Sequence, residues 1–580
     1  MCSCQDPPAM PRELHAIATV VSAPSPYVDR LAQSMRRVAD CQACSEPACG
    51  MASAPADLED EASCRASHIS TLSACCLWRV FMLLPFRARA MASCTCREWR
   101  AVLASPDAWQ QATLDDDGTP LSEDSLVAMC SKARGTLRSL RLGHNNGAQL
   151  RPSSLLQAII GNAKLTEVHA TQLRFPWSGL QCIAALDACP ALHTLRVDAY
   201  MTGEVSDTTN ALVSSLASRR LHCAKLHVAG RLRGETISAL ADAMAEDARL
   251  NVLQLNFADV DDSAMTILAR GLTSCASLTH LCLRGNSISS VGALALASAL
   301  SRSAVRELVL GSNALGDAGA TAIAVLLREN TSITTLDLSG NGITPSGAVS
   351  LAAGLIRNAT LRSLCLDFNA VGPVGAAAIA AALPSTELES LDLEWNGIRC
   401  AGAAVFAFTL QQRTSGTLRH LGIASNSIRA GGAIMLAGAL RNSGLESLVL
   451  AHNTDLGHSL AGATVAAAVA TCASLKHLDV TACGLDADAM TLLCHALEQP
   501  SCALVALRAG GNPAVGQSAV HSLARAAARN SVLRELCFTM VHNECPRLLS
   551  TDVTLTRDPL DDVGHWVGAP HARTTPWRLL

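Results

Sequence analysis

Aromatic residues are scarce in this sequence. Two Tyr, eight Phe and seven Trp make up 3% of its 580 residues, although 49% of all residues are hydrophobic. That hydrophobic fraction excludes an intrinsically disordered chain. The shortage of rings argues against several thick globular cores, one for each ~150 residues. Leu, Ala, Val, Ile and Cys must therefore supply the core, which favours thin, repeated layers.

No charge of one sign dominates, because 45 basic and 49 acidic residues leave a net charge of −4. We therefore predict no nucleic-acid partner. The apolar run 74–84 is too short for a membrane span and contains Arg79, so we expect no membrane insertion. The first residues do not have the pattern of a secretory signal. The 24 Cys are then expected to be reduced thiols in the cytoplasm, or also in the nucleus.

Motifs for common chemistry are missing. The sequence contains no G-x-x-x-x-G-K-[ST] phosphate loop, no H-E-x-x-H and no G-x-S-x-G. Cys41, Cys44, Cys49 and Cys64 could in principle hold zinc, but a second C-x-x-C is absent. We therefore predict that the protein is not an enzyme and has no catalytic, cofactor or metal site.

A repeat dominates the chain. Residues 278–286 have the form L-x-x-L-x-L-x-x-N, and this frame restarts every 27–30 residues. The clear restarts are at Val305, Ile333, Leu361, Leu388, Leu418, Leu445, Leu475, Leu504 and Leu533, and weaker frames begin at Leu137, Leu165, Leu192, Cys223 and Leu250. These fifteen units predict a solenoid.

Each unit combines two kinds of periodicity. The L-x-L centre predicts a short strand with alternate side chains facing inward. Ala293, Leu296, Ala297 and Leu300 then form one apolar helical stripe. One strand and one helix per unit stack into a curved α/β solenoid, with a parallel sheet on the concave side and helices outside. The Asn at the ninth place is expected to hydrogen-bond the turning backbone, and Cys483 replaces it in one unit.

Residues 137–541 resemble leucine-rich repeats of the ribonuclease-inhibitor type, as in ribonuclease inhibitors, NOD-like receptors and Ran GTPase-activating proteins. The resemblance implies a horseshoe fold and a binding surface, but it does not identify a function. The missing phosphate loop excludes an intact NOD-like receptor.

Residues 69–115 differ from the repeats. An apolar helical face at Leu77, Val80, Phe81 and Leu84 ends at Pro85. The run Cys-Arg-x-Trp-Arg at 96–100 follows, and then Pro106 and Trp109. This segment resembles an F-box, although residues 72–75 replace the usual Leu-Pro-x-Glu opening. The resemblance implies that a Skp-type adaptor contacts five residues: Leu77, Trp78, Phe81, Leu84 and Pro85. The alternative is a helical cap for the solenoid.

The predicted domains are a largely disordered segment (1–68), a small all-α F-box-like module (69–115), a connector (116–136), the solenoid (137–541), and a cap with a loose tail (542–580).

The third, fifth and seventh places of each frame should face the concave side. In the middle repeats these places and the adjoining eighth place carry four acids and two aromatics: Asp337, Asp367, Phe368, Asp392, Glu394 and Trp395. Aromatic anchors beside charge are typical of partner-binding hot spots. We expect this surface to hold a basic segment of a partner; the alternative is a solvated sheet face.

Together these features predict a substrate-recognition subunit of a Skp–cullin–F-box ubiquitin ligase, which is a monomer outside its complex. Its partners would be a Skp-type adaptor and an unknown substrate protein. One alternative is a scaffold or regulator without a ligase role. Another is a Ran-type GTPase activator, which would leave residues 69–115 unexplained.

Overall fold

The computed structural model describes residues 225–541, apart from 247–248, 413–416, 457–458, 513–521, 524 and 527–528. Before this range it describes 111–114, 135–142, 164–171, 191–198 and a few single residues, and after it 550–557 and 566–570. The predicted N-terminal segment 1–68 lies outside the described residues. So does the F-box-like module 69–115, apart from Leu103 and one strand.

The chain divides into two units, Met1–Val228 and Ala229–Leu580. In the first unit, four strands pair in parallel and in chain order: β1 (Gln111–Leu114), β2 (Ser139–Leu142), β3 (Glu167–Thr171) and β4 (Thr194–Asp198). Three of these strands, β2 to β4, fall in the frames predicted from Leu137, Leu165 and Leu192. The pattern did not predict β1. A further strand, β5 (Lys225–Ala229), ends at the boundary between the units.

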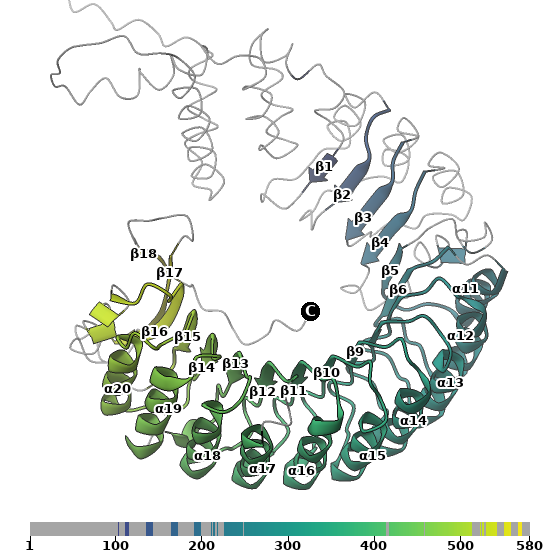
Figure 1. The fold of residues 1–580 in the computed structure, drawn as a ribbon. Coiled ribbons are helices and arrows are strands. Elements are labelled where there is room, and N and C mark those ends of the chain that lie inside the picture. Colours follow the sequence, from purple (N-terminus) through teal and green to yellow (C-terminus); the bar gives the residue numbers. More distant parts are fainter. Residues whose placement is uncertain are drawn as a thin grey trace, which may run out of the picture. The chain divides into compact units, whose positions relative to one another are not determined.

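The second unit alternates strands and helices, one pair per repeat (Figure 1). Its strands are β6 (Val252–Asn256), β7 (His280–Cys282), β8 (Glu307–Val309), β9 (Thr335–Asp337), β10 (Ser363–Cys365), β11 (Ser390–Asp392), β12 (His420–Gly422), β13 (Ser447–Val449), β14 (His477–Asp479), β15 (Ala506–Ala509) and β16 (Glu535–Val541). Neighbours from β6 to β16 pair in parallel, with each strand's first residue opposite the next strand's first residue. Two antiparallel strands follow, β17 (Ser550–Arg557) and β18 (Trp566–Pro570).

One helix follows each strand from β5 to β14. The helices are α11 (Gly234–Glu246), α12 (Asp262–Ser274), α13 (Ser290–Leu300), α14 (Gly316–Glu329), α15 (Pro345–Leu355), α16 (Gly372–Ala382), α17 (Arg399–Gln411), α18 (Ala430–Leu440), α19 (Ser459–Thr471) and α20 (Ala487–Leu497), with short 3₁₀ turns at Leu383–Ser385 and Thr454–Leu456. Within this unit the strands line the inner side of a curve and the helices its outer side (Figure 1). The predicted α/β solenoid is therefore confirmed.

The core consists of Leu and Ala layers, as the composition predicted. In the repeat that begins at Leu278, Leu281 on β7, Leu283 directly after it, and the helix residues Leu296 and Leu300 are all buried. Among the described residues, Phe406 on α17 is the largest fully buried side chain. Each layer thus buries aliphatic side chains between one strand and one helix.

An aspartate in the first turn of two helices caps the helix of the next repeat. Oδ1 of Asp262 accepts hydrogen bonds from the N–H groups of Ser289 and Gly292 (2.8 and 2.9 Å), and Asp317 does the same for Thr344 and Gly347. Burial alone would raise the pKa of Asp262, but a hydrogen bond from the Ser289 hydroxyl and those from the two N–H groups outweigh it, and the pKa is lowered. A Cβ on Gly292 would lie 2.6 Å from Oδ1 of Asp262, so only glycine fits there.

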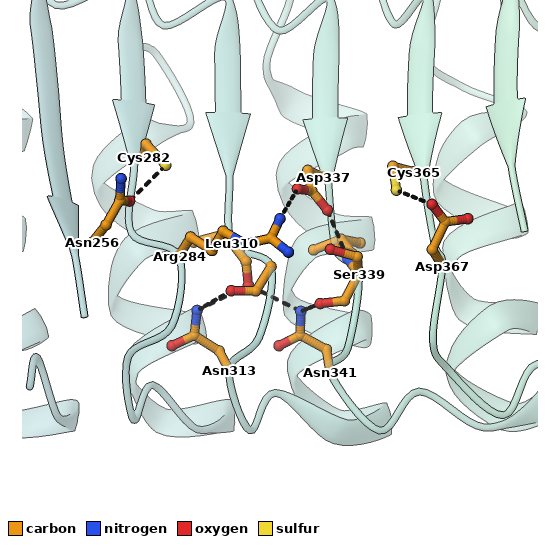
Figure 2. Close-up of polar contacts among 12 residues, drawn as sticks. Asn256, Cys282, Arg284, Leu310, Asn313, Asp337, Ser339, Asn341, Cys365 and Asp367 are labelled. Atoms are coloured by element: carbon orange, nitrogen blue, oxygen red, sulfur yellow. Dashed lines mark hydrogen bonds and ion pairs between the residues drawn. The ribbon is translucent and has the colours of Figure 1, made fainter. Parts of the chain in front are cut away.

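The ninth-place asparagines form hydrogen bonds with backbone groups in the turn after each strand. We call them the asparagine ladder: Asn286, Asn313, Asn341, Asn369, Asn396, Asn426, Asn453 and Asn512. The Nδ2 of Asn313 and of Asn341 both donate to the carbonyl of Leu310, at 2.9 and 3.0 Å (Figure 2). In every such unit the Oδ1 accepts from backbone N–H groups of the preceding repeat, as from Ala258 and Val260 to Asn286. Cys483, in the equivalent place, donates its thiol to the carbonyl of Leu450. The predicted role of the ninth place is confirmed.

We predict that Asn426→Ala lowers the free energy of unfolding by about 3 kcal/mol, because each buried polar group left unpaired costs about 1–3 kcal/mol. Asn426 is fully buried and its amide makes four hydrogen bonds, with Leu393, Ala424, Asn396 and Ile398. Urea unfolding followed by circular dichroism measures the loss. The exposed Asn442→Ala is the control and should change stability by less than about 0.5 kcal/mol; similar losses in both variants would contradict the ladder's role.

Candidate functional site: an acidic and aromatic surface on β9 to β12

The predicted concave residues come from three adjacent repeats. Asp337, Cys365 and Asp392 lie opposite one another at the ends of β9, β10 and β11. Asp367 and Glu394 follow two residues after β10 and β11, and Phe368 and Trp395 follow them. We call Asp367, Phe368, Glu394 and Trp395 the acidic–aromatic patch. The structure therefore brings together the residues that the sequence pattern selected.

Asp337 is paired with a base two repeats away. Nη1 of Arg284 lies 3.4 Å from Oδ2 of Asp337, and both side chains are mostly buried (Figure 2). The pair spans the intervening repeat at Gly311, where a Cβ would lie 3.1 Å from the Asp337 carboxylate and 3.2 Å from the Arg284 guanidinium. Asp337 also accepts a hydrogen bond from the N–H of Ser339. Asp337 thus has a basic partner within the solenoid.

Asp392 is paired with a histidine of the next repeat. Nε2 of His420 lies 2.8 Å from Oδ1 of Asp392, and its Nδ1 lies 2.9 Å from the hydroxyl of Ser447. Gly422 leaves room for this carboxylate, because a Cβ there would overlap it. The hydrogen bond to Asp392 raises the pKa of His420, although burial opposes this effect. The sequence analysis did not select His420. Its third place in the frame that begins at Leu418 would have assigned it to the concave side.

Asp367 and Glu394 have no basic partner of this kind. Asp367 accepts hydrogen bonds from the N–H of Glu394 (2.7 Å) and from the thiol of Cys365 (3.2 Å; Figure 2 shows the latter). The Glu394 carboxylate makes no hydrogen bond or ion pair with the described residues. Burial raises the pKa of Asp367 and of Glu394, and neighbouring carboxylates raise each further. The patch thus holds two half-buried acids whose charge is only weakly compensated.

Cys365 is not a reactive thiol. Burial raises its pKa well above the ordinary value, and the charges of Asp367 and Asp337 raise it further. It therefore remains protonated at neutral pH and acts as a hydrogen-bond donor. Among the described residues, no group of three or more His, Cys, Asp or Glu is arranged to hold a metal ion.

Phe368 and Trp395 form an exposed stack. Their ring centroids lie 6.2 Å apart with an interplanar angle of 14°, and the two residues are 53% and 58% exposed. Both have left-handed backbone conformations, with φ of 56° and 55°. The eighth place is left-handed in the other repeats too: it is glycine at Gly285, Gly340 and Gly511, and elsewhere it is Phe257, Ser312, Ser425, His452 or Ala482. A left-handed backbone lowers the stability of the fold by about 1–3 kcal/mol for each residue other than glycine. Exposed rings offset little of this loss, because they bury little apolar surface.

Comparison with known proteins supports the repeat assignment. The family described as "Leucine Rich repeat" matches residues 274–297, 305–324, 329–352 and 357–380. These segments are leucine-rich repeats. Repeats of this kind form protein-interaction modules. The comparison with curated proteins finds no match.

Among solved structures, the crystal structure of the Rad7 and Elc1 complex in yeast is similar to this chain. The identity is 15% and the TM-score 0.39, over 80% of this chain and 96% of that one.

The five predicted adaptor-binding residues (Leu77, Trp78, Phe81, Leu84 and Pro85) lie outside the described residues. No helix in the described part of the chain is both long and apolar enough to cross a lipid bilayer.

We predict that Glu394→Gln raises the melting temperature at pH 7. The pKa of Glu394 is higher in the folded than in the unfolded chain, so the free energy of unfolding falls as pH rises through the raised pKa. Gln does not ionise and removes this loss. The gain should disappear below about pH 4, where the carboxyl is protonated in both states.

Glu446→Gln is the matched control with the opposite sign. A hydrogen bond to Lys476 lowers the pKa of Glu446, so this variant should lower the melting temperature at pH 7. Thermal melts at pH 4 and pH 7 compare the two variants. A destabilised Glu394→Gln at pH 7 would contradict the electrostatic description of the patch.

Proposed function

We propose that this protein is the substrate-recognition subunit of a Skp–cullin–F-box ubiquitin ligase. The concave face of the solenoid would hold a substrate protein, and residues 69–115 would bind a Skp-type adaptor. Such a receptor performs no chemistry itself. It raises the effective concentration of the substrate beside the ubiquitin-loaded partner.

The observation that carries the binding role is the exposed Phe368–Trp395 stack. Two bulky rings occupy strained left-handed positions and remain more than half exposed. Neither the core nor the asparagine ladder needs these side chains. Non-glycine residues such as Phe257 and His452 share the left-handed backbone at the eighth place of other repeats, so the exposure of the two stacked rings is what sets this place apart. Exposed aromatic residues are typical anchors at protein interfaces.

Support for the adaptor role comes from the sequence of residues 69–115. Its apolar helical face at Leu77, Phe81 and Leu84 ends in Leu-Pro, and the Cys-Arg-x-Trp-Arg run follows at the spacing of an F-box. Helix-in-groove binding of this kind depends on a few apolar anchors. A charged side chain at such an anchor is therefore expected to abolish binding.

The test is a pull-down of a purified Skp-type adaptor with the full-length chain. We predict that the wild type binds and that the double variant Phe81→Asp, Leu84→Asp loses at least tenfold in affinity, about 1.4 kcal/mol or more. The matched control is Phe408→Asp, which changes an exposed aromatic on α17 in the solenoid and should bind the adaptor like the wild type.

Two results would contradict the proposal. If the wild-type chain does not bind the adaptor, the protein is better described as a scaffold or regulator that uses its concave face alone. If the double variant binds as well as the wild type, the segment 69–115 does not act as an F-box.

A further inference from the structure

The concave acids differ in whether they have a partner. Glu307 on β8 faces His280 at 3.5 Å, Asp337 on β9 faces Arg284, and Asp392 on β11 faces His420. Between these pairs, Asp367 and Glu394 form no ion pair with a described residue. A cation from another molecule can therefore bind here without displacing an internal partner.

The surroundings of the patch are also negative. The groups that act on Glu394 are Asp367, Asp392 and Asp479, opposed by His452. Asp337 and Asp392 act on Asp367, opposed by His420. Two half-buried carboxylates in such a field are costly when both are ionised. A bound cation removes that cost, so the field favours a basic ligand over a neutral or acidic one.

The aromatic stack distinguishes arginine from lysine as the basic ligand. Phe368 and Trp395 directly follow Asp367 and Glu394 in the chain, and the N–H of Phe368 donates to the carbonyl of Glu394 at 2.8 Å. The rings and the carboxylates thus belong to the same two turns. The rings are stacked nearly parallel to each other and are more than half exposed, so the stack leaves aromatic surface accessible beside two acceptors.

We infer that the patch recognises an arginine side chain of the protein partner, with the guanidinium stacked on the Phe368–Trp395 rings and its N–H groups donating to Asp367 and Glu394. Arginine is planar, stacks on aromatic faces and carries donors that match two carboxylates. The lysine ammonium is a strongly hydrated point charge that uses neither the flat surface nor both acceptors as well. The inference rests on the proposed function, since it takes a protein as the ligand.

The experiment measures binding of three peptide pools to the full-length chain by fluorescence anisotropy. Each labelled nonapeptide has a fixed central residue, which is arginine, lysine or citrulline, and the flanking positions are random but contain no arginine or lysine. We expect the arginine pool to bind at least tenfold more tightly than the other two. Citrulline has nearly the shape of arginine without its charge, so its pool isolates the electrostatic contribution.

Variants then locate the binding site. Glu394→Gln and Trp395→Gly should each weaken binding of the arginine pool at least fivefold. Trp395→Gly keeps the fold, because glycine occupies the same left-handed position at Gly285 and Gly340. Asp488→Asn on α20 and Phe408→Gly on α17 are matched controls away from the patch and should leave binding unchanged.

Equal binding of the arginine and lysine pools would overturn the inference. So would arginine binding that survives both patch variants. Adaptor binding separates this failure from failure of the proposed function, because none of these variants touches residues 69–115. A chain that retains the adaptor but shows no arginine preference keeps its receptor role and loses only this assignment.

Discussion

The asparagine at the ninth place of the frame, in the turn after each strand, controls the geometry of the repeats. Where the chain turns from strand to helix, backbone N–H and C=O groups are buried, and the ninth-place amide satisfies those of two adjacent repeats at once. Asn426, for example, joins Leu393 and Asn396 of one repeat to its own turn. Since buried polar groups are costly when unpaired, the ladder fixes the spacing of strands. The Leu layers then only have to fill the interior.

Because the asparagines fix the strand spacing and the leucines fill the interior, the residue types at the concave places can vary. The third, fifth, seventh and eighth places carry glycine, serine, histidine, acids or aromatics without disturbing the ladder. Most acids there are compensated by bases of nearby repeats, as Asp392 is by His420. Among the described residues, Asp367, Glu394 and Asp479 form no such pair, and the first two directly precede the exposed rings of Phe368 and Trp395. Acids without a basic partner and exposed aromatic side chains therefore occur at the same two turns.

The sequence predicts most of the solenoid because the pattern repeats. The Leu and Asn positions, the apolar helix stripe and the concave columns all follow from one frame. The strand β1 was missed because residues 111–114 precede the first recognisable frame.

The ion pairs of the concave acids could not be predicted from the sequence. The repeat frame tells which face a side chain lies on, but it does not tell which side chain of another repeat it contacts. Asp337 reaches Arg284 only because Gly311 lies between them. The left-handed eighth place had a signal, namely glycine at Gly285, Gly340 and Gly511.

The central claim is that the acidic–aromatic patch, which follows β10 and β11, contacts the partner directly. Site-specific photocrosslinking tests it most directly, with p-benzoylphenylalanine placed at Phe368 or, for comparison, at the exposed Phe408 on the outer helix α17. The account predicts crosslinks from position 368 to a partner segment that contains arginine, and none to that segment from position 408. Crosslinks to the partner from position 408 alone would contradict it.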